Sequence, residues 1–174
     1  DGNAIDALKN KSIVLEKMDN FQKRIECYDR ILSIKSDLSI LHNKGTALAE
    51  LGEYQEAIKC YDLVLSENKN SVDALNNKAG VLANLGEYRE AIKCFDRALS
   101  IDGKYDSALH NKGIVLGAIG SFDEAIKCLK KSLSIKDSDV TRERLDFYIE
   151  KQNQSQKENT KTESEDNESQ WIEI

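Results

Sequence analysis

The sequence predicts an all-α fold assembled from repeated helix–turn–helix units. Its 174 residues contain no proline, the residue that interrupts helices most strongly, and 40% of them are hydrophobic. Two residue types also recur with a common spacing, since four cysteines and four leucines are each separated by 33, 34 and 34 residues. These positions are Cys27, Cys60, Cys94 and Cys128, and Leu8, Leu41, Leu75 and Leu109. A shared period of this length indicates similar units stacked around a continuous core.

Two of the copies show what one unit contains. Residues 41–67 and 75–101 are identical at 17 of 27 positions. In the second copy, "ALNNKAGVLANL" is followed by Gly86 and then by "EYREAIKCFDRALSI". Small or apolar residues recur every three or four positions in both segments, which predicts two amphipathic helices. Glycine between them, as at Gly52 and Gly120, predicts the left-handed backbone that commonly ends a helix.

The periodicity divides the chain into four helix pairs, a closing helix and a tail. The first pair is atypical, because Arg24 takes the place of a small alanine and Asp19 takes the place of the glycine. In the fourth pair, "SFDE" from Ser121 to Glu124 predicts a capping box at the start of a helix. The residues after the closing helix have almost nothing to bury, which predicts a flexible acidic tail. The expected segments are 1–37, 38–71, 72–105 and 106–139 for the pairs, 140–151 for the closing helix and 152–174 for the tail.

The letters of the repeat resemble the tetratricopeptide repeat, from roughly Ile5 to Asp139. Residues 85–88 read Leu-Gly-Glu-Tyr, and they are followed by the small Ala91 and the aromatic Phe95. The family usually has a proline near the end of the second helix, so other residues must end these helices here. The resemblance implies a right-handed α-α solenoid, or superhelix, that binds proteins or extended peptides on its concave face. It implies a scaffold or adaptor in protein–protein interaction rather than an enzyme.

Charge and hydropathy argue against two classes of partner. The net charge is −6, and the six acidic and two basic residues after Gln152 account for −4 of it, so no basic face for nucleic acid is expected. No apolar run of about 18 residues is present to span a membrane, and the first residues do not read as a signal peptide, so we expect a cytoplasmic protein. The chain begins with Asp1 rather than Met, which leaves open a recognition arm of a larger multidomain enzyme. A structural protein that self-associates through its repeat end faces or its tail is a third interpretation.

The recurring cysteines predict neither a disulfide nor a metal site. Equivalent helices in a stack lie on the order of 10 Å apart, beyond the Cα separation of about 7 Å that a disulfide allows. Residues on four successive units also diverge instead of converging on one ion. We interpret them as small apolar residues copied with the repeat. Since no catalytic triad, phosphate loop or His-Glu-x-x-His motif occurs either, we expect no reaction and no cofactor.

An asparagine recurs on the first helix of every copy. On a concave face these side chains form a ladder, and each amide can donate to and accept from an extended peptide backbone. The pattern resembles the asparagine ladder in the repeat domain of O-linked N-acetylglucosamine transferases, where such amides hold peptide backbone. The alternative is that the asparagines solvate the face or bridge helices. The candidate residues are Asn10, Asn43, Asn77 and Asn111, with Lys9, His42, Asn76 and His110 at the preceding position.

Two further binding modes can be compared with the sequence. Tetratricopeptide domains that hold chaperone C-termini use a clamp of basic residues, but the third copy has Asp73 and Asn77 at those positions, so the clamp is not present. The final letters "WIEI" follow about 20 polar residues with a reach near 25 Å. This pattern is compatible with a tail that docks on a protein surface and also with residues introduced by cloning or design. Its apolar residues are Trp171, Ile172 and Ile174.

Overall fold

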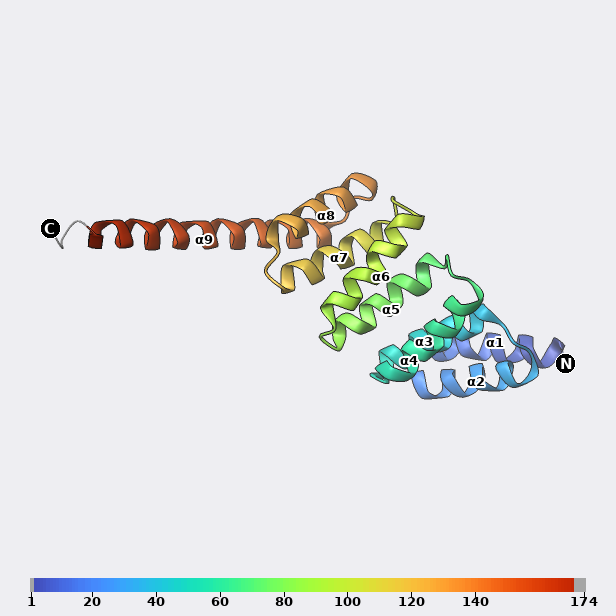
Figure 1. Ribbon diagram of the computed structural model, residues 1–174. Helices are drawn as coiled ribbons and strands as arrows, with labels where there is room; N and C mark the ends of the chain where they lie inside the picture. Colours follow the sequence, from blue (N-terminus) through green and yellow to red (C-terminus); the bar gives the residue numbers. More distant parts are fainter. Residues whose placement is uncertain (1, 171–174) are drawn as a thin grey trace. The chain divides into compact units, whose positions relative to one another are not determined.

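The part of the chain that the structure describes consists of helices joined by short turns. The computed structural model describes the backbone of residues 2–170 and the side chains of residues 2–157. Within that part there are nine α-helices and no strand, which confirms the predicted all-α solenoid class. The helices belong to two compact units, which we describe separately (Figure 1).

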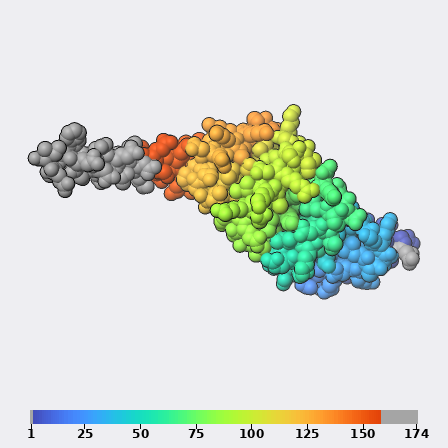
Figure 2. Space-filling model, viewed as in Figure 1, coloured from blue at the N-terminus to red at the C-terminus, as the bar shows by residue number. Residues whose placement is uncertain are grey.

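Unit 1 ends at Tyr105 and is a stack of three helix pairs. The two helices of each pair pack together, and α2 also packs against α3 and α4 against α5, so successive pairs are in contact (Figure 1). Side chains fill the spaces between these ribbons (Figure 2). The helices are α1 (Gly2–Glu16), α2 (Phe21–Ile34), α3 (Leu38–Leu51), α4 (Tyr54–Glu67), α5 (Val72–Asn84) and α6 (Tyr88–Ile101).

Short turns join the helices of a pair, and the predicted glycine conformation is confirmed. The backbone angle φ is +87° at Gly52, +79° at Gly86 and +80° at Gly120. These values lie in the left-handed region that glycine enters without a steric penalty. The first pair has no glycine here, and Asp19 adopts φ +50° in its place. The fold therefore imposes the same turn on a residue that is less suited to it.

The predicted capping box at Ser121 is wrong. Ser121 precedes α8 with φ −79° and ψ 63°, and its side chain makes no capping hydrogen bond. Asn20 adopts a similar backbone, with φ −93° and ψ 72°, in the turn before α2, and its side chain does accept from the backbone N–H of Lys23, so the longer amide side chain caps a helix where the Ser121 hydroxyl does not. Side-chain caps also occur between the pairs of unit 1. Asp37 accepts from two backbone N–H groups at the start of α3, and Ser71 accepts from the backbone N–H of Ala74 at the start of α5.

A repeated ion pair joins successive pairs in unit 1. Lys44 Nζ lies 2.5 Å from Asp29 Oδ1, and Lys78 Nζ lies 2.5 Å from Asp62 Oδ1. Each lysine is on the first helix of its pair, and each aspartate is on the second helix of the preceding pair. The two ion pairs therefore link α3 to α2 and α5 to α4 in the same register.

Small residues allow the helices of a pair to approach closely. Ala57 and Ala91 are completely buried beside the large side chains of Tyr61 and Phe95, which are buried as well. A Cβ atom added at Gly45 would lie 2.9 Å from Cε1 of Tyr61. The alternation of small and large residues that the sequence repeats is therefore a packing requirement.

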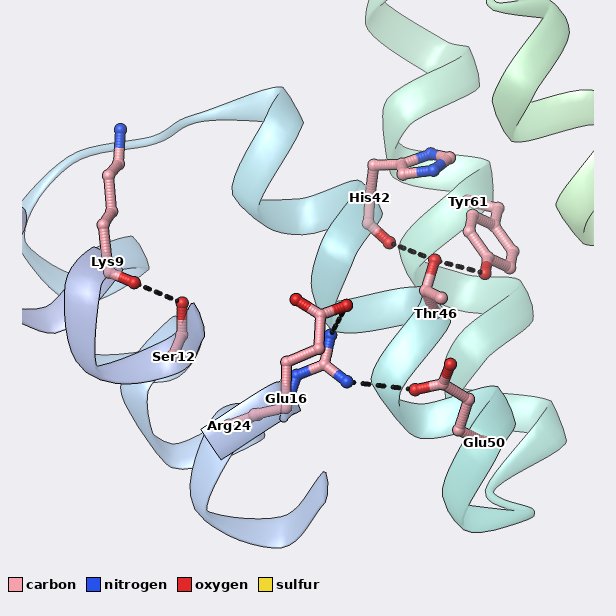
Figure 3. Close-up of polar contacts among 8 residues, drawn as sticks. All are labelled: Lys9, Ser12, Glu16, Arg24, His42, Thr46, Glu50 and Tyr61. Carbon is pink, nitrogen blue, oxygen red and sulfur yellow. Dashed lines mark hydrogen bonds and ion pairs between the residues drawn. The ribbon is translucent and has the colours of Figure 1, made fainter. Parts of the chain in front are cut away.

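Arg24 occupies the position of the small alanine in α2 and is only 3% exposed. Its guanidinium forms ion pairs with Glu16 of α1 at 3.3 Å and Glu50 of α3 at 3.1 Å (Figure 3). Within the described residues its Nε has no hydrogen-bond partner. Burial lowers the pKa of this guanidinium, but Tyr28 and the two carboxylates raise the pKa by more, so the group stays charged. Arg24 therefore connects α1 and α3 electrostatically.

Unit 2 contains α7 (Asp106–Ala118), α8 (Phe122–Ile135) and α9 (Asp139–Gln170). The helix α9 packs against both others. The Tyr148 ring lies so close to Gly117 that an added Cβ would be 2.0 Å from Cζ, and the Tyr148 hydroxyl donates to the Ile114 carbonyl at 3.2 Å. The sequence predicted a closing helix over 140–151, and α9 continues to Gln170. The predicted segment boundaries remain predictions.

Candidate functional site

A chain of polar side chains joins α3 to α5 in unit 1. Asn77 Nδ2 donates to His42 Nε2 at 3.2 Å, and Asn77 Oδ1 accepts from Asn76 Nδ2 at 3.1 Å. Because an amide nitrogen only donates, His42 Nε2 must accept, and the neutral ring carries its proton on Nδ1. Burial lowers the pKa of His42, and the Asp73 carboxylate offsets this in part. The neutral imidazole and the Asn77 amide therefore hold the two helices together.

Tyr61 of α4 contacts the same histidine. The rings of His42 and Tyr61 have centroids 5.6 Å apart. Thr46 Oγ1 lies 3.2 Å from the Tyr61 hydroxyl and 3.3 Å from the carbonyl oxygen of His42, as Figure 3 shows. Burial raises the pKa of the Tyr61 hydroxyl, while its hydrogen bonds with Thr46 and Asn77 lower the pKa in part. Tyr61 therefore stays protonated and restrains the orientation of the His42 ring.

A pocket of about 250 Å³ lies beside His42 and takes residues from α3, from α4, from the turn after α4 and from α5. We call it the polar pocket. Its charged residue is Asp73, whose Oδ1 accepts a hydrogen bond from the Tyr105 hydroxyl at 2.6 Å. The pocket combines amides, hydroxyls, an imidazole and a carboxylate with two apolar side chains. Its lining consists of Leu38, Ser39, His42, Asn43, Val64, Asn68, Ser71 and Asp73.

A second pocket of about 410 Å³ adjoins the first at Leu38, which lines both. We call it the apolar pocket because leucines form most of its wall. Leu38 is 37% exposed and Leu63 is 56% exposed, so both present apolar surface to a ligand. The lining consists of Leu32, Ser36, Leu38, Leu41, Leu63, Ser66 and Glu67. The two pockets therefore share Leu38, and one has a mainly polar lining while the other has a mainly apolar one.

The four recurring asparagines differ in their surroundings. Asn10 and Asn43 are exposed, whereas Asn77 and Asn111 are half-buried. Asn43 lines the polar pocket. The amide of Asn77 is hydrogen-bonded to His42 and Asn76, so this residue bridges helices, as in the alternative that the sequence left open. Peptide binding by the ladder stays a prediction.

The residues immediately before the four recurring asparagines differ in their hydrogen-bond and ion-pair partners. His42 and Asn76 belong to the polar chain around Asn77. Lys9 instead forms an ion pair with Asp37, with Nζ 3.4 Å from Oδ2. In unit 2, His110 Nδ1 lies 2.9 Å from Thr141 Oγ1 of α9, and burial lowers the pKa of His110. The structure therefore brings His42 and Asn76 together with one ladder residue, and it gives Lys9 and His110 separate contacts.

Sequence reasoning missed Asp73 as a binding residue. It considered this position only for the basic residue of a chaperone-tail clamp. The available signal was the alignment of the copies, because Asp73 occupies the position of Ser39 and Ser107. The contact with Tyr105, which is 32 residues away, could not be read from that alignment.

The cysteines have a structural environment. Cys27 and Cys60 are buried, Cys94 and Cys128 are half-buried, and no disulfide joins them. Burial raises the pKa of the Cys60 and Cys94 thiols, which keeps them protonated and poorly nucleophilic. These environments agree with the interpretation of the cysteines as repeated core residues.

The described part of the chain shows neither a metal-binding cluster nor a membrane-spanning helix. There, no cluster of three His, Cys, Asp or Glu side chains is arranged to hold a metal ion. No helix in that part combines the length and hydrophobicity needed to cross a bilayer. The predicted docking residues Trp171, Ile172 and Ile174 lie outside the described residues.

Two family models match overlapping parts of the sequence. The model described as "Tetratricopeptide repeat" matches residues 70–138. The model described as "Anaphase-promoting complex, cyclosome, subunit 3" matches residues 17–98. No curated protein sequence matches the chain. Together the two matches extend over residues 17–138, which is most of the repeat region that the sequence period defines.

Solved structures share the fold at low sequence identity. MamA (residues 41 to the end) from Desulfovibrio magneticus RS-1 is 20% identical with a TM-score of 0.75, and the match covers 86% of each chain. TTC0263 from Thermus thermophilus is 15% identical with a TM-score of 0.75, over 85% of this chain and 82% of that one. YrrB, described as a TPR protein with an unusual peptide-binding site, is 20% identical with a TM-score of 0.67, over 81% and 73%. Residues 70–138 therefore match the tetratricopeptide-repeat model, and most of the chain shares the fold of solved tetratricopeptide-repeat proteins.

Proposed function

We propose that this protein is a scaffold or adaptor that holds an extended peptide of a protein partner on the surface around the polar pocket. The observation that carries the proposal is the position of the exposed Asn43 in a pocket that also contains the Asp73 carboxylate. An asparagine amide offers a donor and an acceptor, which match the C=O and N–H of one peptide unit. Asn43 is therefore the residue of the ladder that we assign to peptide backbone.

The neighbouring polar chain makes this surface suitable for binding. His42 is fixed by the hydrogen bond from Asn77 and by the contact with Tyr61. Side chains that are already ordered lose little conformational entropy when a ligand binds. The amide of Asn77 is occupied within the protein, so we assign it to the support of the site rather than to the ligand.

The relatives support a role in protein interaction in general terms. YrrB is described as having a peptide-binding site, and its fold is shared by this chain. At 20% identity this likeness concerns the fold, so the argument for peptide binding here depends on the pockets of unit 1. We assign no reaction to the protein.

A displayed library of 12-residue peptides, selected on the full chain, tests the proposal. We expect enriched peptides whose affinity falls about three- to tenfold in Asn43→Ala, which removes one donor and one acceptor. Asn84→Ala is the matched control, because Asn84 is also an exposed asparagine on the first helix of a pair but does not line either pocket. A library without enrichment, or equal binding by Asn43→Ala and the control, would refute the proposal.

A further inference from the structure

The charges around the two pockets indicate what kind of peptide fits them. Asp73 is the charged residue in the lining of the polar pocket, and Glu67 is the charged residue in the lining of the apolar pocket. Neither lining contains a lysine or arginine among the described residues. The nearby Lys9 is paired with Asp37, which offsets its charge. The charged side chains in the linings of both pockets are therefore acidic.

Asp73 is available to a cation. Its Oδ1 accepts from the Tyr105 hydroxyl at 2.6 Å, which restrains the carboxylate without neutralising it. No base forms an ion pair with Asp73 within the described residues, and its side chain is exposed. His42 does not supply a positive charge, because its Nε2 accepts the hydrogen bond from Asn77. A lysine or arginine of a ligand would give Asp73 its first cationic partner.

The same pocket is unsuited to an anion. Helix N-termini attract anions through their unpaired N–H groups. Here the side chain of Asp37 already accepts from N–H groups at the start of α3, and Ser71 accepts from the Ala74 N–H at the start of α5. An anionic ligand would also approach the Asp73 carboxylate. The chemistry that binds an acidic peptide tail is therefore lacking on this surface.

The dimensions and the apolar residues fit a side chain better than a small molecule. The polar pocket measures about 250 Å³, below the range of about 300–1,000 Å³ typical of small-molecule sites. Val64 and Leu38 line it and can contact the methylene groups of a long basic side chain, whose charged end then reaches the polar groups. Leu38 also lines the apolar pocket, so the two sites are adjacent.

We infer that the partner peptide carries a lysine or arginine that pairs with Asp73 in the polar pocket and a nearby bulky apolar side chain that fills the apolar pocket. This inference rests on the proposed function, since it specifies the peptide that the same surface takes. It predicts a short motif of one basic and one apolar residue. The spacing of the two residues would appear in the selected sequences.

The test uses the full chain and the peptides that the display selection yields. We expect enrichment of lysine or arginine together with leucine, isoleucine or phenylalanine. One selected sequence is then synthesised with a fluorescent label in three forms, with the basic residue kept, replaced by glutamate or replaced by norleucine. We expect fluorescence anisotropy to give an affinity about tenfold or more weaker for the glutamate and norleucine forms.

Asp73→Asn separates this inference from the proposed function. We expect it to weaken the basic peptide about tenfold and to change the norleucine form less than about twofold. Glu53→Gln is the matched control, because Glu53 is an exposed acid that makes no capping hydrogen bond and lies outside both pockets. Circular dichroism at increasing temperature verifies that both variants fold.

The outcomes separate the inference from the proposed function. Selected peptides without a basic preference, or equal binding of the basic peptide by Asp73→Asn and wild type, would overturn the inference while peptide binding itself stands. Selection of acidic peptides would overturn it as well. No enrichment of any peptide would overturn both the inference and the proposed function.

Discussion

Replacing Gly117 by alanine should destabilise unit 2, although alanine normally favours a helix. The added Cβ would lie 2.0 Å from Cζ of Tyr148 and 2.4 Å from its Cε1, so the ring must move. Tyr148 is 5% exposed and its hydroxyl donates to the Ile114 carbonyl, which means that a displaced ring loses both packing and a hydrogen bond. The helix α9 should be held less firmly against α7 as a result.

The expected magnitude combines three contributions. Overpacking a tight contact costs about 1–3 kcal/mol. Loss of the Tyr148 hydrogen bond costs about 1 kcal/mol. Replacing glycine by alanine inside a helix returns about 0.8–1 kcal/mol. We therefore expect the free energy of unfolding to fall by about 1–3 kcal/mol, with a decrease in Tm of about 2–4 °C per kcal/mol for a chain of this size.

The assay is urea unfolding followed by circular dichroism, with hydrogen exchange of α7 and α9 as a local readout, because repeat stacks need not unfold in one step. Gly80→Ala is the control, since Gly80 lies in the helix α5 and an added Cβ would meet no atom within 4 Å. We expect this control to gain about 0.5–1 kcal/mol. In a Tyr148→Ala background, Gly117→Ala should become neutral or stabilising. Equal stabilisation by Gly117→Ala and Gly80→Ala in the wild-type background would refute the reasoning.

Three other changes have expected outcomes. Burial lowers the pKa of His42 and His110 in the folded state, so their contribution to stability is fully present above the unfolded-state pKa of about 6.5 and is lost as the pH falls below it through the folded-state pKa. In a double variant with His42→Asn and His110→Asn, the free energy of unfolding should depend less on pH below about 6.5, and an unchanged pH dependence would contradict this. Arg24→Met keeps the buried stem and removes a guanidinium whose Nε has no partner in the described residues, so the free energy of unfolding should change by less than about 1 kcal/mol or rise. A loss above about 3 kcal/mol would show that its ion pairs dominate. Changing the four cysteines together to alanine should lower the melting temperature modestly and leave peptide affinity unaltered, and a lost affinity would assign them a role in binding.

Much of the fold could be predicted from the sequence because the repeat states the same information several times. The recurring apolar positions indicated the helices, and the turn glycines Gly52, Gly86 and Gly120 all adopt positive φ. The absence of a cap at Ser121 could not be predicted from the Ser-x-x-Glu spacing, because the spacing does not tell whether the hydroxyl reaches a backbone N–H of the first turn. Asn20 caps α2 from a similar backbone conformation, so the backbone angles alone do not decide the outcome either.

The candidate site was less predictable, because it depends on contacts between helices. The recurrence of asparagine identified Asn43 and Asn77 as a class but not their different surroundings. Asn77 reaches His42 because α3 and α5 are in contact where these two residues lie. The sequence of a single copy of the repeat cannot reveal this contact between copies. The contact of Asp73 with Tyr105 likewise arises from residues 32 positions apart.

The ion pairs between successive helix pairs affect how such a chain can grow. Residues 38–71 contain both Lys44, which pairs with Asp29 in the copy before, and Asp62, which pairs with Lys78 in the copy after. A tandem duplication of this one segment would bring a lysine for the preceding copy and an aspartate for the following one. Each new junction would then have its ion pair without any point mutation. An array of this design can lengthen by gene duplication while the register of its helices is kept.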